Sequence, residues 1–178
     1  MENTQTGLDD VELCKAKSDA LRLLAFRPRS IAELKSRLKR KRFSQNIVDR
    51  AIDLLVKQGL LNDEKFAKLL TQSRLGTRPA GKKRLEAEMR QKGISRDIVE
   101  KAISSVSDQE EHRAAWDLVF RRFQKMKGVT RQKKKARLYG LLRRRGFSQN
   151  VIFSVLDELF AGQTDDLPAM DDAQNDES

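Results

Sequence analysis

Apolar residues recur along this chain at the spacing of helix faces, and one pattern of them occurs three times. The segments 34–48, 85–99 and 138–152 align without a gap. Each begins with two apolar residues four positions apart. Each ends with an apolar pair, whose first residue lies three positions after a serine. The marker serines are 51 and then 53 residues apart, at Ser44, Ser95 and Ser148. Self-similarity at this period indicates a repeat architecture.

Each repeat predicts two helices joined by a tight turn. Leu34 and Leu38, like their equivalents in the other two repeats, form an i, i+4 pair on one helix face. Gly93 and Gly146 follow that helix, where a left-handed residue closes its C-terminus. Arg42 holds the equivalent position in the first repeat, which predicts a strained or differently shaped turn there. The marker serine suits the N-cap of the next helix.

A third helix precedes each pair, over residues 16–26, 63–74 and 108–127. Capping-box sequences at Ser30–Glu33 and Ser107–Glu110 mark helix starts. No segment alternates with period two, which excludes a sheet. We therefore predict an all-α fold of three tandem three-helix repeats in an elongated, curved body. The predicted divisions are an acidic segment 1–15, repeats at 16–60, 61–106 and 107–160, and an acidic, disordered tail 161–178.

Composition limits the function classes. Of 178 residues, 38% are hydrophobic and 35% charged, so each core is thin and the surface large. A single cysteine, Cys14, excludes an intramolecular disulfide framework. The polar, acidic N-terminus is unlike a signal peptide, and no apolar run approaches the roughly 20 residues that span a bilayer. We expect a cytoplasmic protein without a membrane partner.

The charge is strongly uneven. The formal net charge is +11 at pH 7, although residues 161–178 contain six acidic residues and no basic one. Residues 118–156 contain twelve basic residues and no acidic one, which favours contact with nucleic acid or acidic protein surfaces. The acidic tail either competes for this basic face or only solubilises the chain. Candidate partner- or DNA-binding residues are Arg121, Arg122, Lys133, Lys134, Lys135, Arg137, Arg143, Arg144 and Arg145, with Lys39, Arg40 and Arg42 in the first repeat and Lys82, Lys83 and Arg84 in the second.

Catalytic chemistry has no candidate residues, and no metal or cofactor is expected. Residues 76–83 nearly match a phosphate-binding P-loop, but Lys83 stands where Ser or Thr must hold Mg²⁺, and a helix precedes the segment. We interpret it as a loop. His112 is the only histidine, and Cys14 has no nearby partner ligand. Phe43, Ile94 and Phe147 share one repeat position and are expected in the core, whereas Tyr139 is a candidate for base stacking.

These residues resemble the RecX family, bacterial regulators of the RecA recombinase. The similarity covers residues 18–160, and its most specific part is 81–95 in the middle repeat. It also includes Arg27–Ser30, Glu33–Leu34, Gly59–Asp63 and Phe66–Ala67. The resemblance implies a modulator, mainly an inhibitor, that lies in the groove of the RecA–DNA filament and contacts single- and double-stranded DNA. It also implies suppression of ATP hydrolysis, strand exchange and co-protease activity. We expect the chain to be a monomer. The alternative is a general DNA- or RNA-binding helical protein without a recombinase partner.

Overall fold

Nine helices and no strand make up residues 2–161, the part of the chain that the computed structural model describes, with side chains from residue 9 onward. The prediction of disorder in the tail 161–178 lies, from residue 162 onward, outside the described residues. The helices are α1 (Glu2–Phe26), α2 (Ile31–Arg40), α3 (Gln45–Lys57), α4 (Asp63–Leu75), α5 (Lys82–Gln91), α6 (Arg96–Ser104), α7 (Asp108–Phe123), α8 (Arg131–Arg144) and α9 (Gln149–Ala161).

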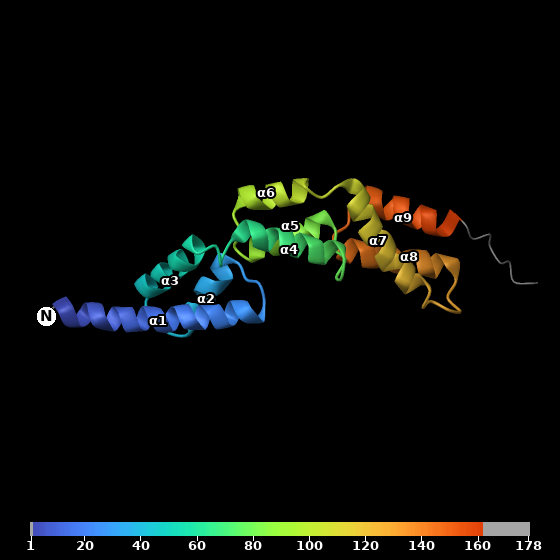
Figure 1. Cartoon of the computed structure of the whole chain (residues 1–178). Coiled ribbons are helices and arrows are strands. Elements are labelled where there is room, and N and C mark those ends of the chain that lie inside the picture. Colours follow the sequence, from blue (N-terminus) through green and yellow to red (C-terminus); the bar gives the residue numbers. More distant parts are fainter. Residues whose placement is uncertain (1, 162–178) are drawn as a thin grey trace, which may run out of the picture.

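The helices form three consecutive units of three, which confirms the predicted fold class. Unit 1 is α1–α3, unit 2 is α4–α6 and unit 3 is α7–α9, and each packs around its own apolar core. The units follow one another along a single long axis, so the body is elongated (Figure 1). A fold of this kind buries little surface between its ends and leaves a long face for a partner.

The predicted apolar pairs lie at the centre of each core. The side chains of the i, i+4 pairs in α2, α5 and α8 are at most 1% exposed. Fully burying each such side chain stabilises the fold by about 1.5–3 kcal/mol. These pairs are Leu34 and Leu38, Leu85 and Met89, and Leu138 and Leu142.

The turn that ends each middle helix has the same shape in all three units. Gly93 and Gly146 have φ of 72° and 78°, as predicted, and Arg42 has φ of 67°. Of the two alternatives predicted for Arg42, the structure shows the strained turn and not the differently shaped one, because a left-handed non-glycine residue is strained.

Most predicted caps form. Both capping boxes are present, and the hydroxyls of Ser44 and Ser148 accept the N–H groups of Ile47 and Val151. Ser95 takes the N-cap position of α6 without a side-chain cap hydrogen bond, so its predicted capping bond is absent.

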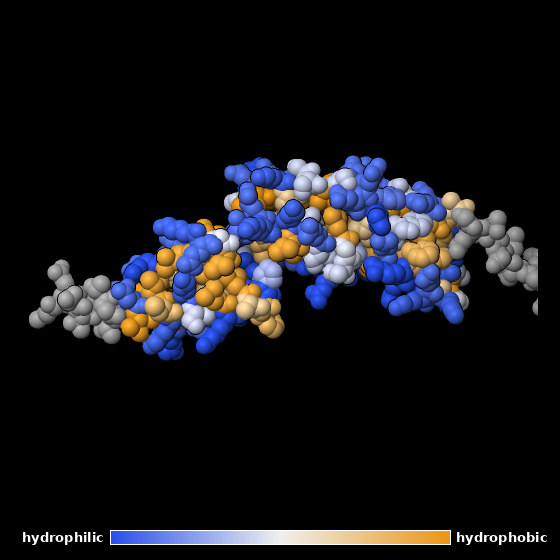
Figure 2. Space-filling model, in the orientation of Figure 1, coloured by the Kyte–Doolittle hydropathy of each residue, from blue (hydrophilic) through white to orange (hydrophobic). Residues whose placement is uncertain are grey.

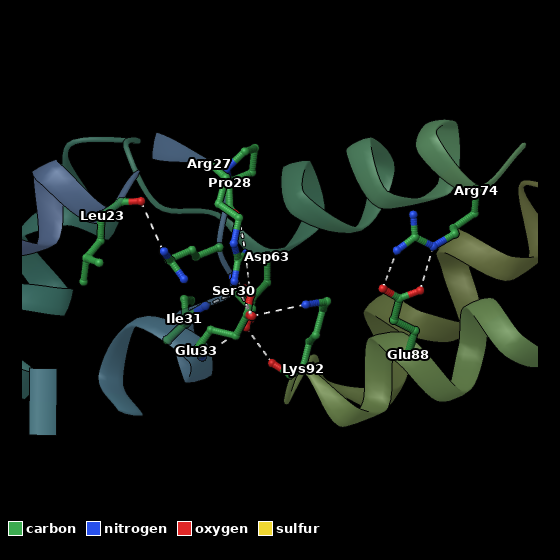
Figure 3. A network of polar contacts seen from close by, with 11 residues as sticks. Leu23, Arg27, Pro28, Ser30, Ile31, Glu33, Asp63, Arg74, Glu88 and Lys92 are labelled. Atoms are coloured by element: carbon green, nitrogen blue, oxygen red, sulfur yellow. Dashed lines mark hydrogen bonds and ion pairs between the residues drawn. The ribbon is translucent and has the colours of Figure 1, made fainter. Parts of the chain in front are cut away.

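The same joint connects units 1 and 2 and units 2 and 3. At the first joint the hydroxyl of Ser30, the N-cap of α2, donates to the carbonyl of Lys92 at the end of α5 (2.6 Å). The first helical N–H of α2, from Ile31, donates to the Asp63 carboxylate of α4 (2.9 Å), as Figure 3 shows. The N-terminus of one middle helix thus rests on the C-terminus of the next, where opposite ends of two helix dipoles meet.

The second joint repeats this geometry with different residues. The N–H of Gly81, the N-cap of α5, donates to the carbonyl of Arg145 at the end of α8 (2.9 Å). The next N–H, from Lys82, donates to the carboxylate of Glu111 in α7 (3.0 Å), whose residue is 3% exposed. Middle helices α2, α5 and α8 therefore follow one another end to end.

Close approach at the joints explains which turns need glycine. A Cβ on Gly146 would lie 2.6 Å from the Cβ of Arg84, and one on Gly93 would overlap the Cβ of Ala32. Arg42 lies in the turn after the middle helix of unit 1. Unit 1 comes first in the chain, so no preceding middle helix rests on this turn. Its turn needs a left-handed backbone but no close approach, so a side chain is sterically possible there.

Two helices differ in length from prediction. Helix α1 begins at Glu2 instead of residue 16, because Leu13 extends the packing against Ile47 and Asp10 pairs with Arg50 (3.4 Å). Helix α7 ends at Phe123 and not at residue 127, since i→i+3 hydrogen bonds tighten the chain after it.

Candidate nucleic-acid interface

A cleft of about 850 Å³ lies between unit 2 and unit 3, and half of its lining residues are basic. We call it the basic cleft. Helices α7 and α8 form its sides, and the loop from α4 to α5 closes one end. Its lining comprises Thr77, Arg78, Pro79, Leu118, Arg121, Arg122, Lys125, Met126, Lys127, Val129, Ala136, Arg137, Gly140, Leu141, Arg144 and Arg145.

Helical spacing brings these cations together. In α7 and the loop after it, Lys125 lies four residues after Arg121 and three after Arg122, so the three side chains lie on the same side. In α8, Arg137, Gly140 and Arg144 do the same, and the Arg144 guanidinium lies over Gly140, where Nη1 would be 3.2 Å from a built Cβ. Figure 2 shows hydrophilic residues over much of unit 3, including the edge formed by these two helices.

The basic cleft holds eight cations and no carboxylate. Within residues 2–161, none of the eight forms an ion pair with an acidic side chain, although most are exposed. A concave surface lined by one sign of charge focuses its field and attracts ligands of the opposite sign. Leu118, Met126 and Leu141 add apolar surface between the cations, which suits a ligand that carries sugars or bases with its phosphates.

A smaller cleft of about 520 Å³ adjoins the first and extends the basic surface onto unit 2. The two clefts share Arg78 and Arg145. The smaller one contains a carboxylate, Glu88, which accepts two hydrogen bonds from the Arg74 guanidinium at 2.7 and 2.6 Å (Figure 3). Because Glu88 neutralises Arg74, positive charge is concentrated in the larger cleft.

Five of the candidate binding residues lie together in the basic cleft: Arg121, Arg122, Arg137, Arg144 and Arg145. One of them also holds the joint together, because Nη1 of Arg145 donates to the carbonyl of Pro79 (3.2 Å). Three further cations of the cleft, Arg78, Lys125 and Lys127, were not among the candidates. For Lys125 and Lys127 the available signal was their place in the acid-free stretch 118–156.

The remaining candidates of unit 3 lie outside the cleft lining. Lys135 pairs with Asp157 of α9 (3.3 Å), so the acid-free stretch does receive a counter-charge from another helix. The ammonium group of Lys134 lies 4.8 Å from the ring centre of Phe123. Lys133 and Arg143 are exposed elsewhere on α8.

The candidates of units 1 and 2 are also separate from the basic cleft. Lys82 pairs with Asp108 across the second joint (2.7 Å), and Arg84 lines the smaller cleft while donating to the carbonyl of Arg144 (3.1 Å). Lys83 is exposed on α5. The basic end of α2, with Lys39, Arg40 and Arg42, belongs to unit 1, at the other end of the body (Figure 1).

The aromatic residues are mainly structural. Ile94 and Phe147 are buried and Phe43 is half-buried against the core of unit 1, as predicted. Tyr139 is half-buried against the core of unit 3, and its ring centre lies 6.1 Å from that of Phe153. Less of the Tyr139 ring is therefore exposed for base stacking than we expected.

Features with catalytic potential are occupied by structural contacts. The P-loop-like segment 76–81 is a loop between helices, and the N–H groups of Gly81 and Lys82 are already bound at the second joint. His112 lies 3.4 Å from Glu158 and 3.3 Å from Ser154. In residues 2–161, no cluster of three His, Cys, Asp or Glu residues could hold a metal, and no helix is long and apolar enough to cross a membrane.

Comparison with known proteins identifies the three units. They match the family models described as the first, second and third three-helix domains of RecX, over residues 16–55, 62–103 and 108–156. A regulatory protein RecX from Chlorobium phaeobacteroides strain BS1 is 34% identical over 85% of this chain and 97% of its own length. Another from Amycolatopsis mediterranei strain U-32 is 33% identical over 89% of this chain and 91% of its own.

A solved structure supports the fold. The crystal structure of RecX from Lactobacillus salivarius superposes with a TM-score of 0.72 at 21% identity, over 85% of this chain and 99% of that one. The three consecutive domain matches and the curated relatives agree on one assignment: the chain belongs to the RecX family of regulatory proteins.

Proposed function

We propose that this protein modulates the RecA recombinase, mainly as an inhibitor, by lying in the groove of the RecA–DNA filament with its basic cleft toward the DNA. The observation that carries this proposal is the carboxylate-free basic cleft on an elongated, repetitive body in a family of regulatory proteins. A filament groove also repeats along its axis, so consecutive units can make similar contacts with consecutive subunits.

The basic cleft supplies the nucleic-acid contacts in this proposal. Lysine and arginine side chains bind phosphates and release condensed counterions, which makes affinity depend steeply on salt. The eight cations lie on both units that border the second joint, so one stretch of DNA backbone would contact units 2 and 3 together. Unit 1, joined to unit 2 by the hydrogen bonds of Ser30 and Asp63, would remain available for protein contacts.

The action is binding without catalysis. Occupying the groove would hinder the filament's ATP hydrolysis, strand exchange and co-protease activity by obstructing the sites that DNA and target proteins use. We place this action in the cytoplasm, where the recombinase and the chromosome meet, and assign the chain no reaction of its own.

The test is RecA's DNA-dependent ATPase at substoichiometric amounts of this protein. We expect inhibition by the unmodified chain and weaker inhibition by Arg122→Glu, which reverses a charge in the cleft. Arg113→Glu is the matched control, because Arg113 is an exposed arginine of the same helix that does not line the cleft. It should inhibit like the unmodified chain.

The basic cleft also suits the alternative, a general nucleic-acid-binding protein that acts without a recombinase. The same experiment separates the two. Tight, salt-sensitive binding to bare DNA without any inhibition of the ATPase would overturn the recombinase proposal and favour the alternative.

A further inference from the structure

The end of α9, after which the acidic C-terminal segment follows in the sequence, is held against both ends of the loop between α7 and α8. Helix α9 ends at Ala161, and the carbonyl of Phe160 accepts a hydrogen bond from Nη2 of Arg131 at the start of α8 (3.2 Å). The ring of Phe160 packs edge-on against Phe123 at the end of α7, with 5.6 Å between ring centres. The loop between α7 and α8 therefore lies next to the end of α9.

That loop is part of the cleft. Lys125, Met126, Lys127 and Val129, which all lie between Phe123 and Arg131, line it. Phe123 and Arg131, which contact the end of α9, thus flank this part of the lining in the sequence. The chain therefore leaves the described fold next to the two ends of a loop that supplies part of the cleft lining.

The segment beyond α9 carries the opposite charge. Residues 162–178 contain six acidic residues and no basic one: Asp165, Asp166, Asp171, Asp172, Asp176 and Glu177. A polypeptide can span at most about 3.3–3.6 Å per residue, so Asp165 lies within roughly 15 Å of Ala161 and the later acids can reach farther. The reach of the segment thus increases from Asp165 to Glu177, toward the loop residues Lys125 and Lys127 of the cleft.

Tethering makes even a weak attraction effective. A segment joined to the rim of its own binding site has an effective concentration on the order of millimolar, with no loss of translational freedom on contact. The lining of the cleft contains eight cations and no carboxylate, so the tail would supply acidic groups that the lining lacks. Contact with the tail would be screened by salt in the same way as contact with phosphate.

We propose that segment 162–178 occupies the basic cleft and competes there with nucleic-acid phosphates, so that the protein restrains its own binding. This inference rests on the proposed function of the cleft. Nucleic acid, with its higher charge density, would displace the tail, whereas weaker polyanions would not. The tail would thereby raise the affinity that a polyanion needs in order to occupy the cleft.

The first experiment removes the charge and keeps the chain length. In the variant D165N/D166N/D171N/D172N/D176N/E177Q, affinity for a fluorescein-labelled oligothymidylate is measured by anisotropy. At about 50 mM salt we expect roughly three- to tenfold tighter binding than by the unmodified chain, and at about 300 mM no difference. Equal affinity of the two proteins at low salt would overturn the proposal.

A matched pair of variants separates contact from net charge. Asp171→Asn/Asp172→Asn and Asp9→Asn/Glu12→Gln each remove two negative charges, but the second pair lies in α1, at the other end of the body. We expect tighter binding only from the tail pair. Equal tightening by both pairs would mean that overall charge alone is responsible, and would overturn the proposal.

A direct readout does not depend on DNA. In a Cys14→Ser background, a nitroxide attached at Ala173→Cys should broaden the backbone amide signals of residues 121–127 and 137–145 but not those of α3. Added oligothymidylate should restore the signals. Absence of broadening in the cleft would overturn the tail proposal alone. Failure of every variant, including the neutralised one, to bind oligothymidylate would instead overturn the proposed function.

Discussion

Arg42, Gly93 and Gly146 occupy the same left-handed turn, yet only two of them are glycine, and the joints supply the reason. A left-handed residue with a side chain costs roughly 1–2 kcal/mol. Gly93 and Gly146 bear a second constraint, because Ala32 and Arg84 of the preceding unit lie against them. Arg42 bears only the first, so glycine is obligatory where another unit docks and optional where the array ends.

This distinction predicts the effect of adding one methyl group. Gly146→Ala should lower the free energy of unfolding by more than Gly59→Ala, since Gly59 has a similar φ of 68° but nothing within 4 Å of a built Cβ. We expect about 1 kcal/mol for the control and roughly 2–4 kcal/mol at the joint. Urea unfolding measures both. Equal losses would mean that the turn matters and the contact between units does not.

At the scale of elements, the sequence predicted those helix ends that short-range signals mark. It did not predict the helix ends and joints that depend on contacts between distant residues. The i, i+4 pairs, the capping boxes and the glycines are short-range signals, and the helices they mark formed as predicted. The N-terminal extension of α1 carries no such stripe before Leu13 and depends on packing against α3. The joint between Ser30 and Lys92 links residues 62 positions apart, which no local pattern encodes.

The first joint also contains an acid that makes stability depend on pH. Burial would raise the pKa of Glu33, but hydrogen bonds from Arg27 (3.0 Å), Lys92 (3.1 Å) and the N–H of Ser30 outweigh it and lower the pKa to about 2. Because the folded pKa is depressed, the unfolded chain binds more protons between about pH 4.5 and 2. The stabilisation by Glu33 is present above this window and is lost as pH falls through it.

Glu33→Gln should therefore lower stability at neutral pH by up to about 3 kcal/mol and flatten its dependence on pH within this window. Urea unfolding at a series of pH values measures the slope. Glu86→Gln is the control, because Glu86 pairs with Arg90 on an exposed i, i+4 face, where ion pairs contribute little. An unchanged slope in Glu33→Gln would contradict the role of this carboxylate.

At the scale of the whole molecule, the candidate site is a property of two units and not of one basic run. The sequence located the stretch that supplies seven of the eight cations of the cleft, 118–156, because charge composition is visible without a structure. It did not separate Arg137, which lines the cleft, from Lys135, which pairs with Asp157. That separation depends on helix rotation and on where α9 packs. Arg78 reaches the cleft only through the second joint.

The cleft should consequently account for most of the salt dependence of nucleic-acid binding. Each lost phosphate contact lowers the slope of log K against log salt by about 0.7 for a single strand. Arg122→Ala/Arg137→Ala should reduce the slope by roughly 1.4, because both guanidinium groups face the cleft without an acidic partner there. Lys68→Ala/Arg113→Ala removes two exposed charges outside the cleft and should leave the slope unchanged. If both double variants reduced the slope equally, binding would depend on the charge of the whole body, and units 2 and 3 would not act together as one site.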